Sequence, residues 1–296
     1  MSPPLTGQPE KMTQPKILGL VAGGGQFPLL VAAGARKQGY SVVAVAFDKE
    51  TSTAINEAAD RVIWVKLGQL GKLIRFFQNE NVSDVVFAGP INKPGAFDIR
   101  PDLRAIKLLL GLKSRNDNAL LSAVAAELSA ENLKVVSALK FVPDLFSPPG
   151  FISSRRPRKG EKDDILFGWP LIKEIGALDI GQCIAVKEKV VVAVEAIEGT
   201  DETILRAGNL AGKNFTVIKT FKPGQDSRID LPALGLGTVE TMIRAKASCL
   251  AYESGSSLFF DMDKAVQLAD RHKIAVVGID PGLPVDIQLE PNSASR

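Results

Sequence analysis

The segment TFKPGQDSRIDLPALGLGTVETM, residues 220–242, has the residue types that hold a phosphate and a metal ion together. Its polar side chains include those of Lys222, Gln225, Asp226, Arg228 and Asp230, and two prolines and three glycines punctuate it. Cations neutralise phosphate charge, and carboxylate oxygens are preferred ligands of divalent metals. We therefore expect a phosphate- and metal-binding loop here, with a solvated surface loop as the alternative.

A second group of acids lies in VVVAVEAIEGTDETIL, residues 190–205. Glu195 and Glu198 follow a very apolar strand, and Asp201 precedes a predicted helix. Thr200 or Asp201 could cap that helix, but a cap does not require two further acids beside it. These carboxylates are therefore candidates for contacts with a metal ion or with water.

A third polar stretch, SRNDNALLSAVAAEL, precedes another predicted helix. Asn116 or Asp117 is suited to cap the helix that follows, and this role alone would explain both residues. A contact with a ligand remains the alternative.

Three consecutive glycines, Gly23 to Gly25, follow the first apolar run. They permit positive φ and close approach of a ligand, and Pro28 suits the first helical turn after them. A dinucleotide fingerprint requires a small residue where Pro28 stands, although Asp48 has the spacing of a ribose-binding carboxylate. A nucleotide or phosphate contact is favoured; a dinucleotide site and a purely structural turn are the alternatives.

Other familiar catalytic chemistries lack their markers in this sequence. Neither G-x-S-x-G nor G-x-x-x-x-G-K-[ST] occurs, and His272, the single histidine, ends a predicted helix, where a cation suits the helix dipole. Cys183 and Cys249 form no C-x-x-C pair, so we expect two buried thiols.

Composition limits the class of protein. The 296 residues are 45% hydrophobic with a net charge of +3. This charge is too small, and aromatic residues are too few, for a nucleic-acid-binding surface. No apolar run reaches the roughly 18 residues of a membrane span, and the N-terminus has no apolar core of a signal peptide, so we expect a cytoplasmic protein.

Short β-branched runs alternate with helical segments in the first half of the chain, which predicts an α/β fold with a parallel sheet. The expected strands are 17–21, 42–47, 62–65, 85–88 and 135–138, and the expected helices include 29–38, 71–79 and 103–111. We predict a Rossmann-like domain at 16–146, a linker at 147–164, a C-terminal catalytic α/β domain with a mixed sheet at 165–281, and flexible tails at 1–15 and 282–296. The C-terminal domain should contain a hairpin that turns near Glu188.

Several motifs together resemble the LpxI family, the UDP-2,3-diacylglucosamine pyrophosphatases of lipid A biosynthesis. The resemblance covers residues 16–281 and rests on LGLVAGGGQFP, FAGPINKP, NDNALL, LDIGQ, VEAIEGTDETI and KPGQDSRIDLPALGLGTVE. It implies a Mg²⁺-dependent hydrolase that cleaves UDP-2,3-diacylglucosamine to UMP and 2,3-diacylglucosamine 1-phosphate (lipid X). The substrate would lie between a Rossmann-like domain and a differently folded C-terminal domain.

The resemblance also implies roles for particular residues. The aspartate of the family's V-D-L-P motif, which is essential for turnover, corresponds to Asp230. Catalytic candidates are Asp230, Arg228, Lys222 and Gln225, and metal-ligand candidates are Asp230, Asp201, Glu198 and Glu195. Substrate-binding candidates are Gly23, Gly24, Gly25, Gln26, Asn92, Lys93, Asp117, Gln182, Thr200 and Thr238. We expect a homodimer.

The first fifteen residues and the basic stretch SRRPRKGEK lie outside the family pattern. Arg155, Arg156, Arg158 and Lys159 in this stretch predict peripheral contact with an anionic membrane, at the cytoplasmic face of the inner membrane. Two other functions stay open: an NAD(P)-dependent oxidoreductase, because of the glycine loop and Asp48, and a non-catalytic nucleotide-sugar or lipid carrier.

Overall fold

The computed structural model describes residues 16–91, 100–112, 117–223, 226–229 and 231–290. These residues form two compact units that divide after Phe141, and each unit is described by itself. No helix among the described residues is both long and apolar enough to cross a bilayer.

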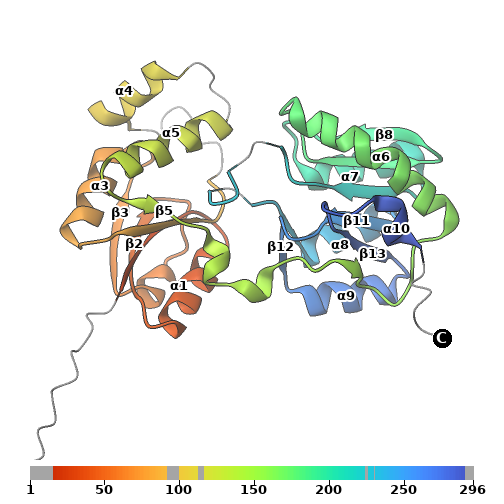
Figure 1. Cartoon of the computed structure of the whole chain (residues 1–296), viewed down its shortest axis with the longest axis horizontal. Helices are drawn as coiled ribbons and strands as arrows, with labels where there is room; N and C mark the ends of the chain where they lie inside the picture. Colours follow the sequence, from red (N-terminus) through yellow and green to blue (C-terminus); the bar gives the residue numbers. More distant parts are fainter. Residues whose placement is uncertain (1–15, 92–99, 113–116, 224–225, 230, 291–296) are drawn as a thin grey trace, which may run out of the picture. The chain divides into compact units, whose positions relative to one another are not determined.

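The N-terminal unit is built on a five-stranded parallel sheet, which confirms the predicted Rossmann-like class (Figure 1). Its strands have the order β3-β2-β1-β4-β5, and the apolar side chains of the central strands are almost fully buried. The strands are β1 (Ile17–Ala22), β2 (Ser41–Phe47), β3 (Arg61–Val65), β4 (Asp84–Ala88) and β5 (Lys134–Val135). The helices are α1 (Phe27–Lys37), α2 (Ile55–Ala58), α3 (Leu70–Asn79), α4 (Leu103–Gly111) and α5 (Asp117–Ala130), with a 3₁₀ turn at Ala138–Lys140.

The C-terminal unit contains a six-stranded mixed sheet of order β6-β13-β11-β9-β7-β8, which confirms the predicted mixed sheet. Strands β9, β11 and β13 are parallel, whereas β6, β7 and β8 pair antiparallel with their neighbours. The strands are β6 (Gly150–Phe151), β7 (Cys183–Lys187), β8 (Val190–Val194), β9 (Thr216–Lys219), β11 (Cys249–Glu253) and β13 (Ala275–Ile279), and β10 (Ala233–Gly235) pairs with β12 (Leu258–Phe260). The β7–β8 hairpin turns at Glu188 and Lys189, as expected.

Helices cover both faces of this sheet. The helix α6 (Lys159–Ala177) packs Ile165, Trp169 and Ile172 onto one face. The opposite core contains side chains of α7 (Thr200–Ala211), α8 (Leu236–Ala245) and α9 (Met262–Arg271). Cys183 and Cys249 are fully buried, as predicted, and burial raises the pKa of both thiols. His272 is the C-cap of α9, as predicted from its position.

Two segments differ from the sequence interpretation. The predicted linker 147–164 forms β6 and the first turns of α6, and it packs on the C-terminal unit. The predicted tail after residue 281 contains α10 (Val285–Leu289), in which Leu289 is buried and Gln288 accepts a hydrogen bond from Asp280 N at 2.7 Å. In both segments, specific partners order residues whose composition is typical of loops.

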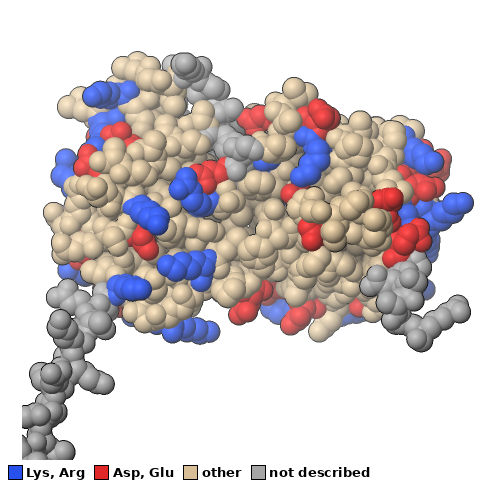
Figure 2. All heavy atoms as spheres, viewed as in Figure 1, with Lys and Arg blue, Asp and Glu red and all other residues tan. Residues whose placement is uncertain are grey.

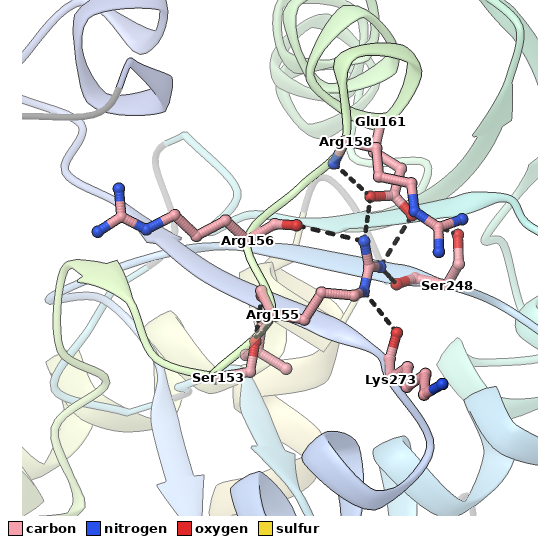
Figure 3. A network of polar contacts seen from close by, with 8 residues as sticks. Ser153, Arg155, Arg156, Arg158, Glu161, Ser248 and Lys273 are labelled. Carbon is pink, nitrogen blue, oxygen red and sulfur yellow. Dashed lines mark hydrogen bonds and ion pairs between the residues drawn. The ribbon is translucent and has the colours of Figure 1, made fainter.

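An ion pair between Arg155 and Glu161 holds the segment 147–164, which was predicted to be a linker, in place (Figure 3). Arg155 Nη1 and Nη2 donate to the two Glu161 oxygens at 2.8 and 2.9 Å, and Arg155 also donates to the carbonyls of Ser248 and Lys273. Glu161 further accepts from Ser248 Oγ at 2.7 Å and from Arg158 N at 2.7 Å. Burial opposes ionisation of Glu161, but these hydrogen bonds outweigh it and lower its pKa. The arginine is therefore occupied within the protein.

We expect Glu161→Gln to lower the free energy of unfolding of the C-terminal unit by about 3 kcal/mol, because it leaves a largely buried guanidinium without its counterion. Urea unfolding measures the loss. The lowered pKa means that the ion pair stabilises the fold fully above pH 4.5, the ordinary pKa of the group, and that this stabilisation disappears as pH falls through the folded pKa. The difference between the variant and the wild type should therefore shrink in acid. Glu127→Gln, at the more exposed Arg104–Glu127 pair, is the control and should cost under about 1 kcal/mol.

Candidate active site

The carboxyl edge of the C-terminal sheet gathers several predicted site residues. Strand β9 ends at Lys219, and its partner β7 begins at Cys183, directly opposite Lys219. Strand β8 pairs with β7 so that Val194 lies beside Ile184, which brings Glu195 to the same edge. Open α/β sheets bind ligands beyond the carboxyl ends of their parallel strands. The register therefore locates a candidate site here.

A hydrogen-bonded chain connects a buried cation with a buried carboxylate at this edge. Lys219 Nζ donates to Thr200 Oγ1 at 3.1 Å, and this hydroxyl donates to Glu195 Oε1 at 2.9 Å. The other oxygen of Glu195 accepts from Gln182 N at 3.1 Å. Glu195 is 6% exposed and Lys219 is 5% exposed. Three predicted residues, Glu195, Thr200 and Gln182, thus lie together around Lys219.

Lys219 also anchors the chain that follows Asp230. Its ammonium donates to the carbonyl of Ala233 at 2.9 Å, the first residue of β10. An ammonium has three N–H donors, and within the described residues Lys219 uses two of them, for Thr200 and Ala233. The third remains for a further acceptor, such as a phosphate oxygen.

Other unsatisfied donors and acceptors surround this chain. Helix α7 begins at Thr200 after Gly199, whose φ is +84° and which cannot provide a side-chain cap. The first amides of a helix have no partner within the helix, so they can donate to an anion. Among the described residues, the buried atoms Gln182 Oε1 and Thr220 Oγ1 have no hydrogen-bond partner, and Thr220 is 1% exposed. Buried polar atoms without partners are uncommon in native proteins, so this edge fits a polar ligand.

The predicted metal-ligand carboxylates have partners of their own. Glu198 accepts from Arg206 at 2.5 Å and from Ala196 N at 3.1 Å. The pKa of Glu198 is lowered, first by a hydrogen bond from its own backbone N–H and then by Arg206. Asp201 is exposed in the first turn of α7. In the part of the chain that the structure describes, no three His, Cys, Asp or Glu side chains converge as a metal site.

The polar loop after β9 contains two predicted cations, each with a carboxylate partner. Lys222 pairs with Asp179 at 3.0 Å, and Arg228 pairs with Asp226 at 2.6 Å. Hydrogen bonds from Arg228 lower the pKa of Asp226. Gln225 and Asp230 lie outside the described residues. Thr238, in the first turn of α8, is partly buried.

The sequence interpretation missed three residues at this edge: Lys219, Glu253 and Lys173. Glu253, which ends β11 and is 4% exposed, pairs with Lys173 of α6 and accepts from Phe221 N at 3.2 Å. Lys219 and Glu253 are each the charged last residue of a buried strand, and this position was the available signal.

In the N-terminal unit, the glycine loop is packed against the chain after β4. Gly23 N donates to Ala88 O at 2.8 Å, and Gly24 N donates to Pro90 O at 2.7 Å. A Cβ on Gly23 would lie 2.4 Å from Gly89 O, whereas one on Gly25 would meet no atom within 4 Å. Only Gly25 of the three has a positive φ, +75°. This close packing favours the structural-turn alternative for Gly23, and the position with open space for a ligand is Gly25.

We expect Gly23→Ala to destabilise the N-terminal unit by about 2 kcal/mol or more, because its methyl group would overlap two backbone carbonyls. Gly24→Ala should cost less, since its Cβ would stay 3.4 Å from its nearest neighbours. Thermal unfolding of the two variants measures this difference. Equal melting temperatures would show that the loop backbone relaxes and that close packing does not explain Gly23.

The sequence profiles of two domains together match nearly the whole chain. The LpxI N-terminal domain matches residues 17–145, and the LpxI C-terminal domain matches residues 148–277. The chain is also 32% identical over 277 residues to the UDP-2,3-diacylglucosamine pyrophosphatase LpxI of Caulobacter vibrioides, covering 89% of this chain and 98% of that protein. The chain belongs to the LpxI family.

Both candidate regions fall within the LpxI domains: the glycine loop in the N-terminal match, and the edge with Glu195 and Lys219 in the C-terminal match. The other predicted residues of the LpxI N-terminal domain are less defined. Gln26 is the N-cap of α1, Asp117 begins α5 with its side chain outside the description, and Asn92 and Lys93 lie outside the described residues.

Solved structures add no argument to the LpxI assignment. The ADP complex of purK, N5-carboxyaminoimidazole ribonucleotide synthetase, has a TM-score of 0.27 and 16% identity, covering 58% of this chain and 32% of that one. Glycinamide-RNase-transformylase T from Mycobacterium tuberculosis has a TM-score of 0.24 and 12% identity, covering 62% and 44%. Such scores support no statement on fold or function.

Proposed function

We propose that this protein hydrolyses the pyrophosphate linkage of UDP-2,3-diacylglucosamine to UMP and 2,3-diacylglucosamine 1-phosphate (lipid X) in lipid A biosynthesis. The observation that carries the proposal is the sequence similarity to the Caulobacter vibrioides protein. That protein is named UDP-2,3-diacylglucosamine pyrophosphatase, and the alignment covers 98% of its length. The reaction breaks one P–O–P bond: water adds to one phosphorus, and the bridging oxygen leaves on the other phosphate.

The carboxyl edge of the C-terminal sheet supports this chemistry. A diphosphate is an anion, and Lys219, Lys222 and the N-terminus of α7 supply positive charge and N–H donors there. The Lys219 ammonium is held by Thr200 and Ala233 before any ligand arrives. Such preorganised donors stabilise charge that develops on the leaving phosphate.

Glu195 fixes the hydroxyl of Thr200, which in turn accepts from Lys219. We assign this carboxylate a positioning role, because the amide of Gln182 and the hydroxyl of Thr200 already occupy both of its oxygens. Asp230 is assigned to the attacking water, on the basis of its place in the family motif.

We also propose a requirement for Mg²⁺. The described carboxylates do not form a ready metal site, since Glu195 and Glu198 are engaged elsewhere. Asp230 would hold the ion, with Asp201 as a further candidate. When bound, such an ion neutralises phosphate charge as a Lewis acid.

One assay tests this proposal: incubation of the purified protein with UDP-2,3-diacylglucosamine and Mg²⁺ or EDTA, followed by detection of UMP. We expect UMP with Mg²⁺ and little with EDTA. A non-catalytic carrier would bind substrate without releasing UMP, and an oxidoreductase would instead bind reduced nicotinamide. UMP release in the presence of EDTA would refute the metal requirement but not the pyrophosphatase activity.

A cytoplasmic location, a homodimer and peripheral contact with anionic membrane at the inner-membrane face belong to the same proposal. The substrate is a glycolipid, so the enzyme must meet a lipid surface. Light scattering of the purified protein tests the dimer, and salt-dependent sedimentation with anionic vesicles tests the membrane contact. Of the four predicted membrane-binding cations, Arg155 is occupied by Glu161, so Arg156, Arg158 and Lys159 remain.

A further inference from the structure

We propose that the C-terminal unit carries a second phosphate-binding pocket, at the edge of its sheet opposite Glu195 and Lys219. The pocket is formed where the chain enters the parallel strands β9, β11 and β13, so it lies at the amino ends of strands whose carboxyl ends form the candidate active site. Its volume is about 300 Å³.

The lining of this pocket is strongly cationic. It contains Arg158, Lys213, Lys246 and Lys273, together with His272, and no Asp or Glu. All five side chains are exposed, and within the described residues none of them forms an ion pair. On the face shown in Figure 2, acidic and basic side chains are interspersed.

A neighbouring groove extends the cationic surface. It shares Lys213 and Lys246 with the pocket and adds Arg244, with Glu202 as its single acid. The excess of positive charge therefore continues beyond the pocket, which would attract a dianion from solution.

The ordinary explanation of these cations is that they balance helix dipoles, because α7, α8 and α9 all end near the pocket. Each helix C-terminus carries the equivalent of about half a negative charge, so three amount to roughly one and a half. Four cationic side chains exceed this charge. Dipole compensation alone leaves a positive pocket.

Carbonyls in the turns that follow α8 and α9 also have other donors. Lys246 O accepts from Asn214 N at 2.9 Å, and Arg155 donates to Ser248 O and Lys273 O (Figure 3). No hydrogen bond from the ammonium groups of Lys213, Lys246 or Lys273 to a carbonyl occurs among the described residues. These ammonium groups are therefore available to a ligand.

The Arg155–Glu161 pair makes the rim of the pocket rigid. It joins the start of α6, beside Arg158, to the loops before β11 and β13. Arg158 and Lys273 consequently project from backbone that is held in place without a ligand. Because donors fixed in advance lose less entropy on binding, this arrangement favours a compact anion with several oxygens, which is the chemistry of phosphate.

Titration of inorganic pyrophosphate into the whole protein, in metal-free buffer and followed by calorimetry, tests this pocket. Lys213→Gln/Lys246→Gln should weaken binding at least about fivefold, and added salt should weaken it in the wild type. Lys37→Gln is the matched control, because Lys37 is likewise an exposed lysine at the C-terminal end of a helix, α1, but lies outside the pocket.

Acetylation of lysines, read by mass spectrometry, locates the bound anion. Pyrophosphate should protect Lys213, Lys246 and Lys273 but not Lys37. Arg158→Gln provides a second variant should the double variant fail to fold. Unprotected pocket lysines, or equal affinity in a folded pocket variant and the control, would overturn the proposal.

A parallel sedimentation with vesicles identifies the source of the phosphate. Binding to phosphatidylglycerol vesicles but not to phosphatidylcholine vesicles, with loss in the pocket variants, would identify a lipid headgroup. Pyrophosphate binding that the pocket variants lose, without vesicle binding, would identify a soluble phosphate compound. Either result supports the pocket. These binding tests do not depend on whether the protein releases UMP.

Discussion

Asp230→Ala should yield a folded protein whose turnover of UDP-2,3-diacylglucosamine is at least about a hundredfold slower than that of the wild type, the lower range for loss of a positioned acid–base group. A methyl group can neither orient water nor bind a metal ion. The flanking sequence is polar and rich in proline and glycine, so the fold should tolerate the substitution. Single-turnover kinetics measures the loss.

Substrate should still bind to Asp230→Ala, through nucleotide and acyl contacts, and should accumulate uncleaved. Asp226→Ala is a suitable comparison, because this neighbouring carboxylate is paired with Arg228. Near-normal turnover by Asp230→Ala would transfer the role to Asp201, Glu198 or Asp226. A loss of affinity as large as the loss of rate would make Asp230 a ground-state contact.

Lys219→Met should lower kcat by about a hundredfold, comparable to the loss of one preorganised electrostatic donor. Methionine keeps most of the apolar stem of the lysine but removes the charge and the anchors to Thr200 and Ala233. The chain after Asp230 would then lose one of its attachments. We expect the effect mainly in kcat, because the charge on the leaving phosphate grows during the reaction.

Lys187→Met is the matched control for this variant. Lys187 also ends a strand of the same sheet and also donates to a backbone carbonyl, that of Ala211 at 2.8 Å, but it lies at the opposite edge. Circular dichroism verifies folding of both variants. Equal activity of folded Lys219→Met and Lys187→Met would show that the buried ammonium is structural only.

The secondary structure followed from local patterns, whereas the site depended on tertiary register. Apolar runs such as 17–21 and 42–47 predicted strands, since burial on both faces demands β-branched and small apolar side chains. Lys219 could not be recognised in the same way. Only the pairing of β7 with β8 and β9 shows that its ammonium reaches Thr200 beside Glu195.

Long-range partners explain the segments that differed from prediction. The charged stretch around Arg155 has the composition of a linker, but Glu161, Ser248 and Lys273 bind its guanidinium. The sequence around Gly23 suggests a ligand contact. In the structure, the backbone of Gly89, 66 residues later in the chain, occupies the space that a side chain at Gly23 would need. The spacing of residues along the sequence does not reveal such contacts between distant parts of the chain.

Phosphorus-31 NMR of the reaction of purified protein with UDP-2,3-diacylglucosamine and Mg²⁺ tests the proposed function most directly. We predict loss of the two diphosphate resonances and the appearance of two phosphomonoesters in equal amounts, UMP and the sugar 1-phosphate. A diphosphate that persists unchanged with folded, substrate-binding protein would contradict the assignment of pyrophosphatase activity to this chain.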